Sequence, residues 1–278
     1  MLVANSKQLV FSAWKMQKAI GAFNVHNLEI LDAVMKAAAA KKSPVIVQIT
    51  PATLAYFPPI YFMRLVQAAA KIYPDVPLAL HLDHGKELEQ IMECLELGFG
   101  SVMIDASQKD FLTNVKITKK VVKAAKHFRV AVEAEIGIMP NYKKNEKLNT
   151  VNIEQAKEFV KRTSIDFLAA PVGTCHGMKG PEGTEHINFI HLKNLFSEIK
   201  IPLVLHGASG VSFSELKRAR LYGIAKVNFD TAIRKIFDNT LRKFLLGNKS
   251  EEDLRVYLNE AGKSVQKLVK GKINALYY

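Results

Sequence analysis

Several features that mark other classes of protein are scarce or absent in this sequence. It has only two cysteines, Cys94 and Cys175, and they form no C-x-x-C pair. This excludes a disulfide framework, and a reducing cytoplasm is the expected location. No apolar run approaches the roughly 18 residues that a membrane-spanning helix needs. The first residues also lack a basic leader followed by an apolar core, so we expect neither a membrane span nor a signal peptide.

Acidic residues are outnumbered by basic ones. The chain has 39 Lys and Arg against 26 Asp and Glu, which gives a formal net charge of +13. A basic excess can indicate a polyanionic partner, but the lysines are spread over expected helix surfaces, as at Lys41, Lys119 and Lys143. No dense basic block or nucleic-acid motif is present. We therefore expect no nucleic-acid partner, while the positive field would favour an anionic, phosphorylated substrate.

Short apolar runs alternate with helical patterns along the whole chain. The expected strands are 20–25, 45–49, 77–84, 101–104, 129–136, 166–172, 202–206 and 225–229. The expected helices are 5–18, 28–41, 60–73, 86–97, 109–127, 152–163, 188–199, 213–222 and 232–273, the last with a break near Gly247. The segment between 50 and 59 contains Pro51, Pro58 and Pro59 and is expected to be a loop.

Strictly alternating strands and helices predict a parallel sheet. Eight such units in 278 residues favour a closed (β/α)8 barrel, the TIM barrel, over an open doubly wound sheet. No G-x-G-x-x-G follows the first strand, which argues against a dinucleotide-binding fold. We expect an α/β protein with one domain over residues 1–278, an extra N-terminal helix and a helical C-terminal extension.

Polar side chains gather at the carboxyl ends of the expected strands, where (β/α)8 barrels carry their active sites. These residues are Asn24, Thr50, Asp83, His84, Asp105, Glu133, Glu135, His176, His206, Asn228 and Asp230. His84, His176 and His206 end three different strands, and each is followed by glycine. Three imidazoles at one barrel mouth match the layout of a catalytic zinc site with an open position.

The other five histidines have less informative positions. His81 alternates with two leucines and is expected to fill the barrel interior. His26, His127, His186 and His191 lie in expected helices or loops, and we interpret them as surface residues.

Two glycine-rich segments and one strand end are expected at the same mouth: GTCHGMKG at 173–180, HGASG at 206–210 and VNFDT at 227–231. Loops after the seventh and eighth strands often hold a phosphate in such barrels. Glycines let backbone N–H groups approach phosphate oxygens, and Ser209, Thr231 and a helix N-terminus add donors. Because glycines also form ordinary tight turns, these segments support a phosphate site mainly through their place beside the histidines.

An ordered set of motifs resembles the class II, zinc-dependent fructose-bisphosphate aldolase family, which includes tagatose-bisphosphate and related ketose-bisphosphate aldolases. The motifs are FNVHN (23–27), LHLDHG (80–85), SVMID (101–105), VEAEIG (132–137), GTCHG (173–177), LVLHGASG (203–210) and KVNFDT (226–231). The resemblance covers about residues 19–231. It implies a zinc-dependent aldehyde-lyase of glycolysis or carbohydrate metabolism that forms a homodimer or homotetramer. Its default reaction is the reversible cleavage of fructose 1,6-bisphosphate to dihydroxyacetone phosphate and glyceraldehyde 3-phosphate.

The resemblance also implies roles for individual residues. It implies His84, His176 and His206 as zinc ligands and Asp83 as the neighbouring acid/base. Asp105 and Glu135 would support the site or hold the metal in an alternative position. The implied substrate-binding residues are Asn24, Gly177, Lys179, Gly207, Ser209, Asn228, Asp230 and Thr231. A monovalent cation, Na⁺ or K⁺, is expected near the phosphate. No lysine stands at a strand end in an apolar pocket, so a Schiff-base mechanism has no candidate.

Two segments depart from the family pattern. The loop GIMPNYKKNEKLN lacks the Gly-Gly that precedes the family's second acid, and Glu146 is its single acidic residue. Its length and polarity suggest a lid in which Glu146 transfers the second proton, or alternatively a solvated surface where Glu146 pairs with nearby lysines. The residues that would receive the far phosphate also differ, with Lys263 near the expected arginine. The alternatives are therefore an aldolase for another ketose phosphate, such as tagatose 1,6-bisphosphate, and a non-catalytic zinc- or phosphosugar-binding relative.

Overall fold

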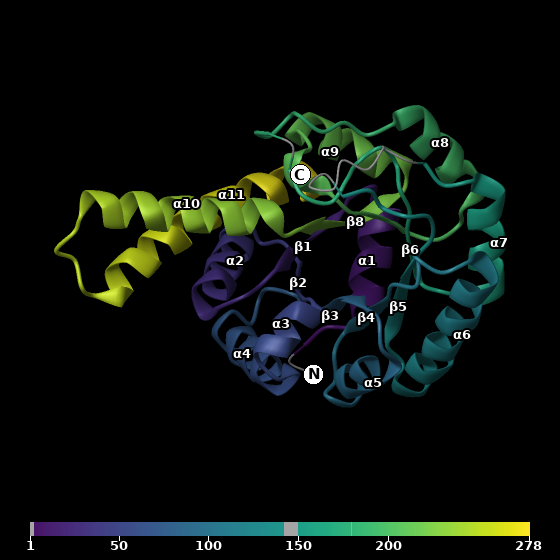
Figure 1. The fold of residues 1–278 in the computed structure, drawn as a ribbon, viewed down its shortest axis with the longest axis horizontal. Coiled ribbons are helices and arrows are strands. Elements are labelled where there is room, and N and C mark those ends of the chain that lie inside the picture. Colours follow the sequence, from purple (N-terminus) through teal and green to yellow (C-terminus); the bar gives the residue numbers. More distant parts are fainter. Residues whose placement is uncertain (1–2, 142–149, 179) are drawn as a thin grey trace.

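Eight parallel strands close into a barrel in the order of the sequence in the computed structural model, which describes residues 3–141, 150–178 and 180–278 (Figure 1). The strands are β1 (Ile20–Asn24), β2 (Val45–Ile49), β3 (Leu78–Gly85), β4 (Ser101–Ile104), β5 (Ala131–Glu135), β6 (Phe167–Ala169), β7 (Leu203–Leu205) and β8 (Ile224–Phe229). Pairing of β1 with β8, with Ala22 opposite Asn228, closes the ring. The predicted (β/α)8 fold is confirmed.

Helices surround the barrel and follow the strands along the chain (Figure 1). They are α1 (Ser6–Lys15), α2 (Leu28–Ala40), α3 (Pro51–Tyr56), α4 (Pro59–Ile72), α5 (Leu88–Glu96), α6 (Phe111–Phe128), α7 (Ile153–Thr163), α8 (Phe189–Glu198), α9 (Phe213–Ala219), α10 (Thr231–Gly247) and α11 (Leu254–Tyr277). Several begin at an asparagine whose side chain accepts a backbone N–H of the first turn, as Asn27 does from Ile30. Such caps explain why the helix starts were readable from the sequence.

The expectation of a loop at 50–59 is wrong. Residues Pro51–Tyr56 form α3, which begins at Thr50, and the Thr50 hydroxyl accepts the backbone N–H of Thr53. Proline suits the first helical position because it lacks an N–H that would have no partner there and its φ is already helical. Pro51 and Pro59 thus start the six-residue α3 and the 14-residue α4 instead of excluding helices.

The first helix covers the amino-terminal end of the barrel. The backbone N–H of Ser6 bonds to Gly100, just before β4, and Phe11 packs on Phe167 at the start of β6 with ring centroids 6.1 Å apart. Val10 of α1 is fully buried with the inward-facing residues of several strands. Because this end is filled, an accessible site has to lie at the other end, where the strands terminate.

The C-terminal extension is a helical pair, as predicted. Figure 1 shows α10 and the beginning of α11 projecting away from the barrel, while the rest of α11 returns to pack on α2. Helix α10 ends at Gly247, which agrees with the predicted break. Among the described residues, no helix is long and apolar enough to span a membrane.

Candidate active site

His84 stands on the end of β3 in an unusual backbone conformation. Its φ of 54° lies in the left-handed region, and the β3–β4 register shifts between Leu82 and Gly85. Such a conformation costs a non-glycine residue about 1–3 kcal/mol and is typical of functional sites. Its Nδ1 lies 2.8 Å from Asp105 Oδ2, and Ser107 holds the other Asp105 oxygen through its hydroxyl at 2.7 Å. Because Nδ1 is held by Asp105, Nε2 is the ring nitrogen of His84 that can bind a ligand at the barrel mouth.

His206 follows β7 and is almost fully buried. Its Nε2 lies 2.9 Å from Glu133 Oε1, while its Nδ1 has no hydrogen-bond partner among the described residues and lies 3.4 Å from Glu135 Oε2. The next residue, Gly207, has φ 64°, and a Cβ there would overlap the backbone of Cys175. The glycine after this histidine is therefore required by a close chain crossing.

His176 comes from the loop after β6, and its backbone N–H donates to Pro140 at 2.8 Å. Its ring centroid lies 5.1 Å from that of His84 and 6.1 Å from that of His206. Burial and the neighbouring imidazoles of His84 and His206 lower the pKa of His176 to about 3. This ring is therefore neutral and keeps a lone pair that a metal can accept.

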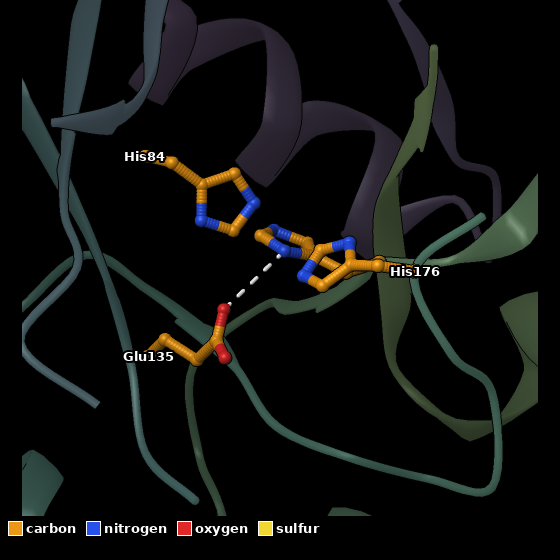
Figure 2. Close-up of side chains that lie close together, drawn as sticks. His84, Glu135 and His176 are labelled. Carbon is orange, nitrogen blue, oxygen red and sulfur yellow. Dashed lines mark ion pairs between the residues drawn. The ribbon is translucent and has the colours of Figure 1, made fainter. Parts of the chain in front are cut away.

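These three histidines and Glu135 form one cluster, which we call the imidazole cluster. One potential ligand atom from each residue lies within 4.8 Å of the others. Figure 2 shows His84, Glu135 and His176 converging, with a dashed line for the ion pair between Glu135 and His206. Within the part of the chain that the structure describes, Glu135 Oε2 and His206 Nδ1 are buried without a hydrogen-bond partner, which is costly unless something binds them. Three imidazoles and one carboxylate are the donors that zinc prefers, so the cluster fits a divalent metal.

The charges around the imidazole cluster also favour a cation. Burial opposes a charge on His84, but the carboxylates of Asp83, Asp105 and Glu135 outweigh burial and raise the pKa of His84 to about 10. Burial in turn raises the pKa of Glu135 to about 7. The carboxylates thus create a field that stabilises a positive charge on His84, and a bound metal cation would satisfy the same field.

Asp83 lies beside the imidazole cluster, with Oδ1 at 3.9 Å from His84 Nε2. Its Oδ1 accepts a hydrogen bond from Asn228 Nδ2 at 3.1 Å, and its Oδ2 accepts from Asn24 and Gln48 at 3.2 and 3.3 Å. Burial acts to raise the pKa of Asp83, but the nearby His84, His206 and Lys226 lower it overall. Asp83 is therefore an ionised carboxylate that is held by Asn24, Gln48 and Asn228 and lines the cavity.

A cavity of about 580 Å³ opens at this end of the barrel. It is lined by Asn24, Thr50, Asp83, His84, Lys86, Asp105, Asn141, His176, Gly177, Met178, His206, Gly207, Ser209, Asn228, Asp230, Thr231, Arg234 and Lys235. The structure therefore brings together predicted site residues from six segments of the chain, at the ends of β1, β3, β4 and β8 and in the loops after β6 and β7. Glu135 joins them through the imidazole cluster, whereas Glu146 and Lys179 lie outside the described residues.

The chain matches the family model described as "Fructose-bisphosphate aldolase class-II" over residues 4–277. This protein belongs to the class II fructose-bisphosphate aldolase family. Among solved structures, it resembles the YdjI aldolase of Escherichia coli K12 with 31% identity, a TM-score of 0.86, and coverage of 99% of this chain and 97% of that one. A putative fructose-1,6-biphosphate aldolase from Coccidioides immitis is 26% identical with a TM-score of 0.87, over 98% of this chain and 96% of that one. Fructose-bisphosphate aldolase from Campylobacter jejuni shares the fold at 24% identity, with a TM-score of 0.84 and coverage of 99% and 95%.

The glycine-rich segments of this class II aldolase lie at the cavity as predicted. Gly177 has φ 100° and Gly207 φ 64°, conformations that glycine adopts without strain. Ser209 lies in a short 3₁₀ turn, and its hydroxyl accepts the backbone N–H of Ala232 in the first turn of α10 at 3.2 Å. The N-terminus of α10 therefore faces the same space as these loops, an arrangement suited to an anion.

The sequence reading missed one histidine at this mouth. His26, placed among the surface histidines, is half-buried, and its Nε2 lies 2.9 Å from Asp230 Oδ1 while its Nδ1 faces Thr53. Arg234 holds the same carboxylate with its guanidinium. The FNVHN motif places His26 two residues beyond the end of β1, and that position was the available signal for its place at the mouth.

The barrel interior below the cavity holds more polar residues than the sequence suggested. His81 fills the interior as predicted, and its Nδ1 lies 2.7 Å from Ser101 Oγ. Lys226 on β8 is also buried there, with Nζ 2.8 Å from Glu133 Oε2. Lys226 does not line the cavity and is not in an apolar pocket, so among the described residues it offers no Schiff-base nucleophile.

Proposed function

We propose that this class II aldolase is metal-dependent and cleaves a ketose bisphosphate, with fructose 1,6-bisphosphate as the default substrate. The products would be dihydroxyacetone phosphate and glyceraldehyde 3-phosphate. The observation that carries the proposal is the ionised Asp83 carboxylate placed beside three imidazoles and Glu135 in one cavity. Acid/base chemistry at a carbonyl needs this combination of a base and an electrophilic site.

His84, His176 and His206 would hold the metal, and Glu135 would support the site or hold the metal in an alternative position. Bound there, zinc would supply a Lewis acid for the ketose oxygens. Asp83 would remove the proton of the C4 hydroxyl. The electron pair of that O–H bond then forms the aldehyde carbonyl, and the electrons of the C3–C4 bond move into the ketone half. Asp105 would orient His84 through its contact with Nδ1.

The ketone half and its phosphate would lie over the loops after β6, β7 and β8. Gly177, Gly207, Ser209 and Thr231 offer backbone and hydroxyl donors, and Asn24, Asn228 and Asp230 line the same cavity. We include Lys179 in this group on the family pattern, as well as a monovalent cation, Na⁺ or K⁺, near the phosphate. The N-terminus of α10, where the N-cap residue Asp230 makes no side-chain cap hydrogen bond, supports the assignment of the phosphate to this end.

The second phosphate would bind at the outer rim. Lys263 does not line the central cavity; it pairs with Glu260 and lines a separate hollow between α2 and α11. Lys86 and Lys235, in contrast, are exposed cavity residues, and no ion pair of theirs is among those of the described residues. We assign the far phosphate to these two lysines. Because lysine is a flexible point charge without the fork of an arginine, this rim suits more than one sugar length or configuration.

A substrate panel tests the proposal. Fructose 1,6-bisphosphate, tagatose 1,6-bisphosphate and fructose 1-phosphate would each be mixed with zinc-loaded protein, and dihydroxyacetone phosphate and aldehyde measured. Cleavage of fructose 1,6-bisphosphate with the highest kcat/KM supports the default, and preference for another ketose phosphate supports the alternative. Binding of dihydroxyacetone phosphate without cleavage of any substrate would instead show a non-catalytic relative.

A further inference from the structure

A charged pair is enclosed inside the barrel, directly beneath the cavity. Glu133 on β5 and Lys226 on β8 are both fully buried, and Lys226 Nζ lies 2.8 Å from Glu133 Oε2. Neither side chain lines the cavity. A buried ion pair rarely stabilises a fold more than apolar residues of similar volume would, because both charges have to be desolvated. Fold stability therefore does not explain why this pair is present.

On one side, the pair contacts a residue of the imidazole cluster. Glu133 Oε1 lies 2.9 Å from His206 Nε2. A carboxylate at this distance accepts the Nε2 proton and so leaves Nδ1 of the ring as a lone pair. Nδ1 is the buried atom that faces Glu135 Oε2 at 3.4 Å and forms no hydrogen bond with the described residues. Glu133 thus selects both the tautomer and the orientation that a metal ligand needs.

On the other side, the pair reaches Asp83. Lys226 Nζ donates to Asn228 Oδ1 at 2.8 Å, and Asn228 Nδ2 donates to Asp83 Oδ1 at 3.1 Å. Because an ammonium group only donates, it fixes the carbonyl end of the Asn228 amide toward itself and the N–H₂ end toward Asp83. Lys226 thus fixes the orientation of the Asn228 amide, so that its N–H₂ group points toward the Asp83 carboxylate.

We propose that Glu133 and Lys226 are positioning residues that hold His206 and Asp83 in a common geometry from beneath the cavity. The proposal rests on the proposed function of Asp83 as the base and of the imidazole cluster as the metal site. The ion pair connects the metal site to the base, because Glu133 contacts His206 and Lys226 contacts Asp83 through Asn228. Loss of the pair changes the metal site and the base together, although neither member touches substrate.

The double variant Glu133→Gln/Lys226→Met tests this proposal. It removes both charges together, so neither is left buried alone, and its Tm should stay within a few degrees of wild type. The apparent affinity for cobalt(II), measured by competition with a chelator, should fall about ten- to a hundredfold, the usual scale for losing such a support. The visible spectrum of bound cobalt should change, and kcat should fall about tenfold or more while KM changes less than about twofold.

Lys272→Met is the matched control. Lys272 is also a buried lysine in an ion pair, with Glu182 at 3.2 Å, but it lies outside the network beneath the cavity. This variant should change Tm and leave the cobalt affinity and spectrum as in wild type. A double variant at Glu133 and Lys226 with wild-type cobalt affinity, spectrum and kcat would show that the pair is structural only, and would overturn the proposal.

A measurement on the wild-type protein keeps the proposal testable even if the double variant does not fold. Nitrogen–proton correlation spectra of zinc-loaded protein should show His206 protonated on Nε2 and bound through Nδ1. Protonation on Nδ1 would refute the proposed role of Glu133. The cobalt and NMR measurements do not need turnover. Absence of cleavage by the wild type would therefore refute the proposed function. The positioning of His206 would still be decided by the cobalt and NMR measurements.

Discussion

At the scale of the residue, Asp83 combines a position deep in the barrel with a retained charge. Hydrogen bonds from Asn24, Gln48 and Asn228 satisfy its oxygens, and the neighbouring histidines keep its pKa low despite burial. In the proposed role of base, an ionised Asp83 would need no proton release before it acts.

We predict that Asp83→Ala keeps its zinc and loses most of the cleavage activity. Removal of a general base usually lowers kcat by about 10²–10⁴-fold. Zinc content should stay near one per chain, because the imidazole cluster is unchanged. Zinc analysis of the purified variant together with steady-state cleavage assays checks both parts. Wild-type turnover in this variant would reject Asp83 as the base.

His206→Ala should have the opposite profile. It removes a ring whose Nδ1 faces the other ligands, and a site with two imidazoles left binds zinc much more weakly. We expect zinc content below about a tenth of wild type after dialysis and, for that reason, no measurable cleavage. Metal analysis after gel filtration decides the point, and full zinc occupancy in this variant would contradict the ligand assignment.

Asp230 predicts a specific dependence of stability on acid pH. Although burial acts in the opposite direction, hydrogen bonds from His26 and Arg234 lower the pKa of Asp230 from 3.8 to about 2. A carboxyl group with a lowered folded-state pKa stabilises the fold above its unfolded pKa. That contribution is lost as the pH falls from about 4 toward about 2.

The Asp230→Asn variant should therefore have a lower Tm than wild type at pH 6, and the difference should shrink between pH 4 and pH 2. Thermal melts at a series of pH values measure it. A difference in Tm that stays constant down to pH 2 would show that the carboxylate charge does not contribute.

At the scale of the element, each strand end delivers one or two polar groups, and the following turn sets their direction. The left-handed conformation of His84 turns its ring toward Asp105 instead of continuing the strand alternation. Gly207 allows the chain to pass against the backbone of Cys175 and so brings the loops after β6 and β7 together. The site therefore depends on the backbone turns at His84 and Gly207 as well as on its side chains.

The segment between β5 and α7 carries the hypothesis of a second acid. Glu146 lies outside the described residues, and it is the single acidic residue between Glu135 and Glu154. If Glu146 protonates the enediolate carbon, Glu146→Gln should slow hydrogen exchange at dihydroxyacetone phosphate by about a hundredfold. Its zinc content should not change, because Glu146 is not among the proposed metal ligands.

Deuterium incorporation from solvent, followed by NMR or mass spectrometry, measures this exchange. Glu154→Gln is the matched control, since Glu154 is an exposed acid on the first turn of α7 and does not line the cavity. Equal exchange rates in wild type and Glu146→Gln would leave Glu146 as a solvated surface residue that pairs with nearby lysines.

At the scale of the whole molecule, the two ends of the barrel differ: one end is filled by α1 and the other holds the cavity. Helix α1 fills the amino-terminal end, and the polar network around Glu133 and Lys226 lies between that plug and the cavity. Three expectations stay predictions: a homodimer or homotetramer, a single domain over residues 1–278, and a cytoplasmic location. Figure 1 shows α10 and the beginning of α11 projecting away from the barrel, but Thr231, Arg234 and Lys235 at the start of α10 line the cavity at the barrel mouth.

Metal removal should affect the whole molecule. Glu135 Oε2 and His206 Nδ1 are buried and form no hydrogen bond with the described residues, and a ligand that binds only the folded state raises its stability. We expect chelated protein to lose all cleavage activity and to melt several degrees below the zinc-loaded form. Calorimetry with and without chelator measures the shift, and restored zinc should recover both Tm and activity. Equal melting temperatures would show that the imidazole cluster binds no metal in the folded protein.

Much of the fold was readable from the sequence because its causes are local. Alternating apolar runs and amphipathic segments set the order of strands and helices, and asparagine caps set many helix starts. The fold class then followed from the count of units. The three histidines could be grouped because a parallel barrel brings all strand ends to one side. The loop expected at 50–59 was the exception, because a proline can begin a helix as readily as it can prevent one.

The sequence by itself predicted Asp83, His84 and His206 at strand ends and His176 in the glycine-rich loop after β6, which the structure brings to one cavity. Only the tertiary structure decided that His26 faces Asp230, that Lys263 lies in a separate hollow, and that Glu133 and Lys226 join His206 to Asp83. The physical reason is that these contacts join residues from different strands or helices. Their distances depend on barrel closure and on the direction of each side chain, which no local pattern of residues specifies.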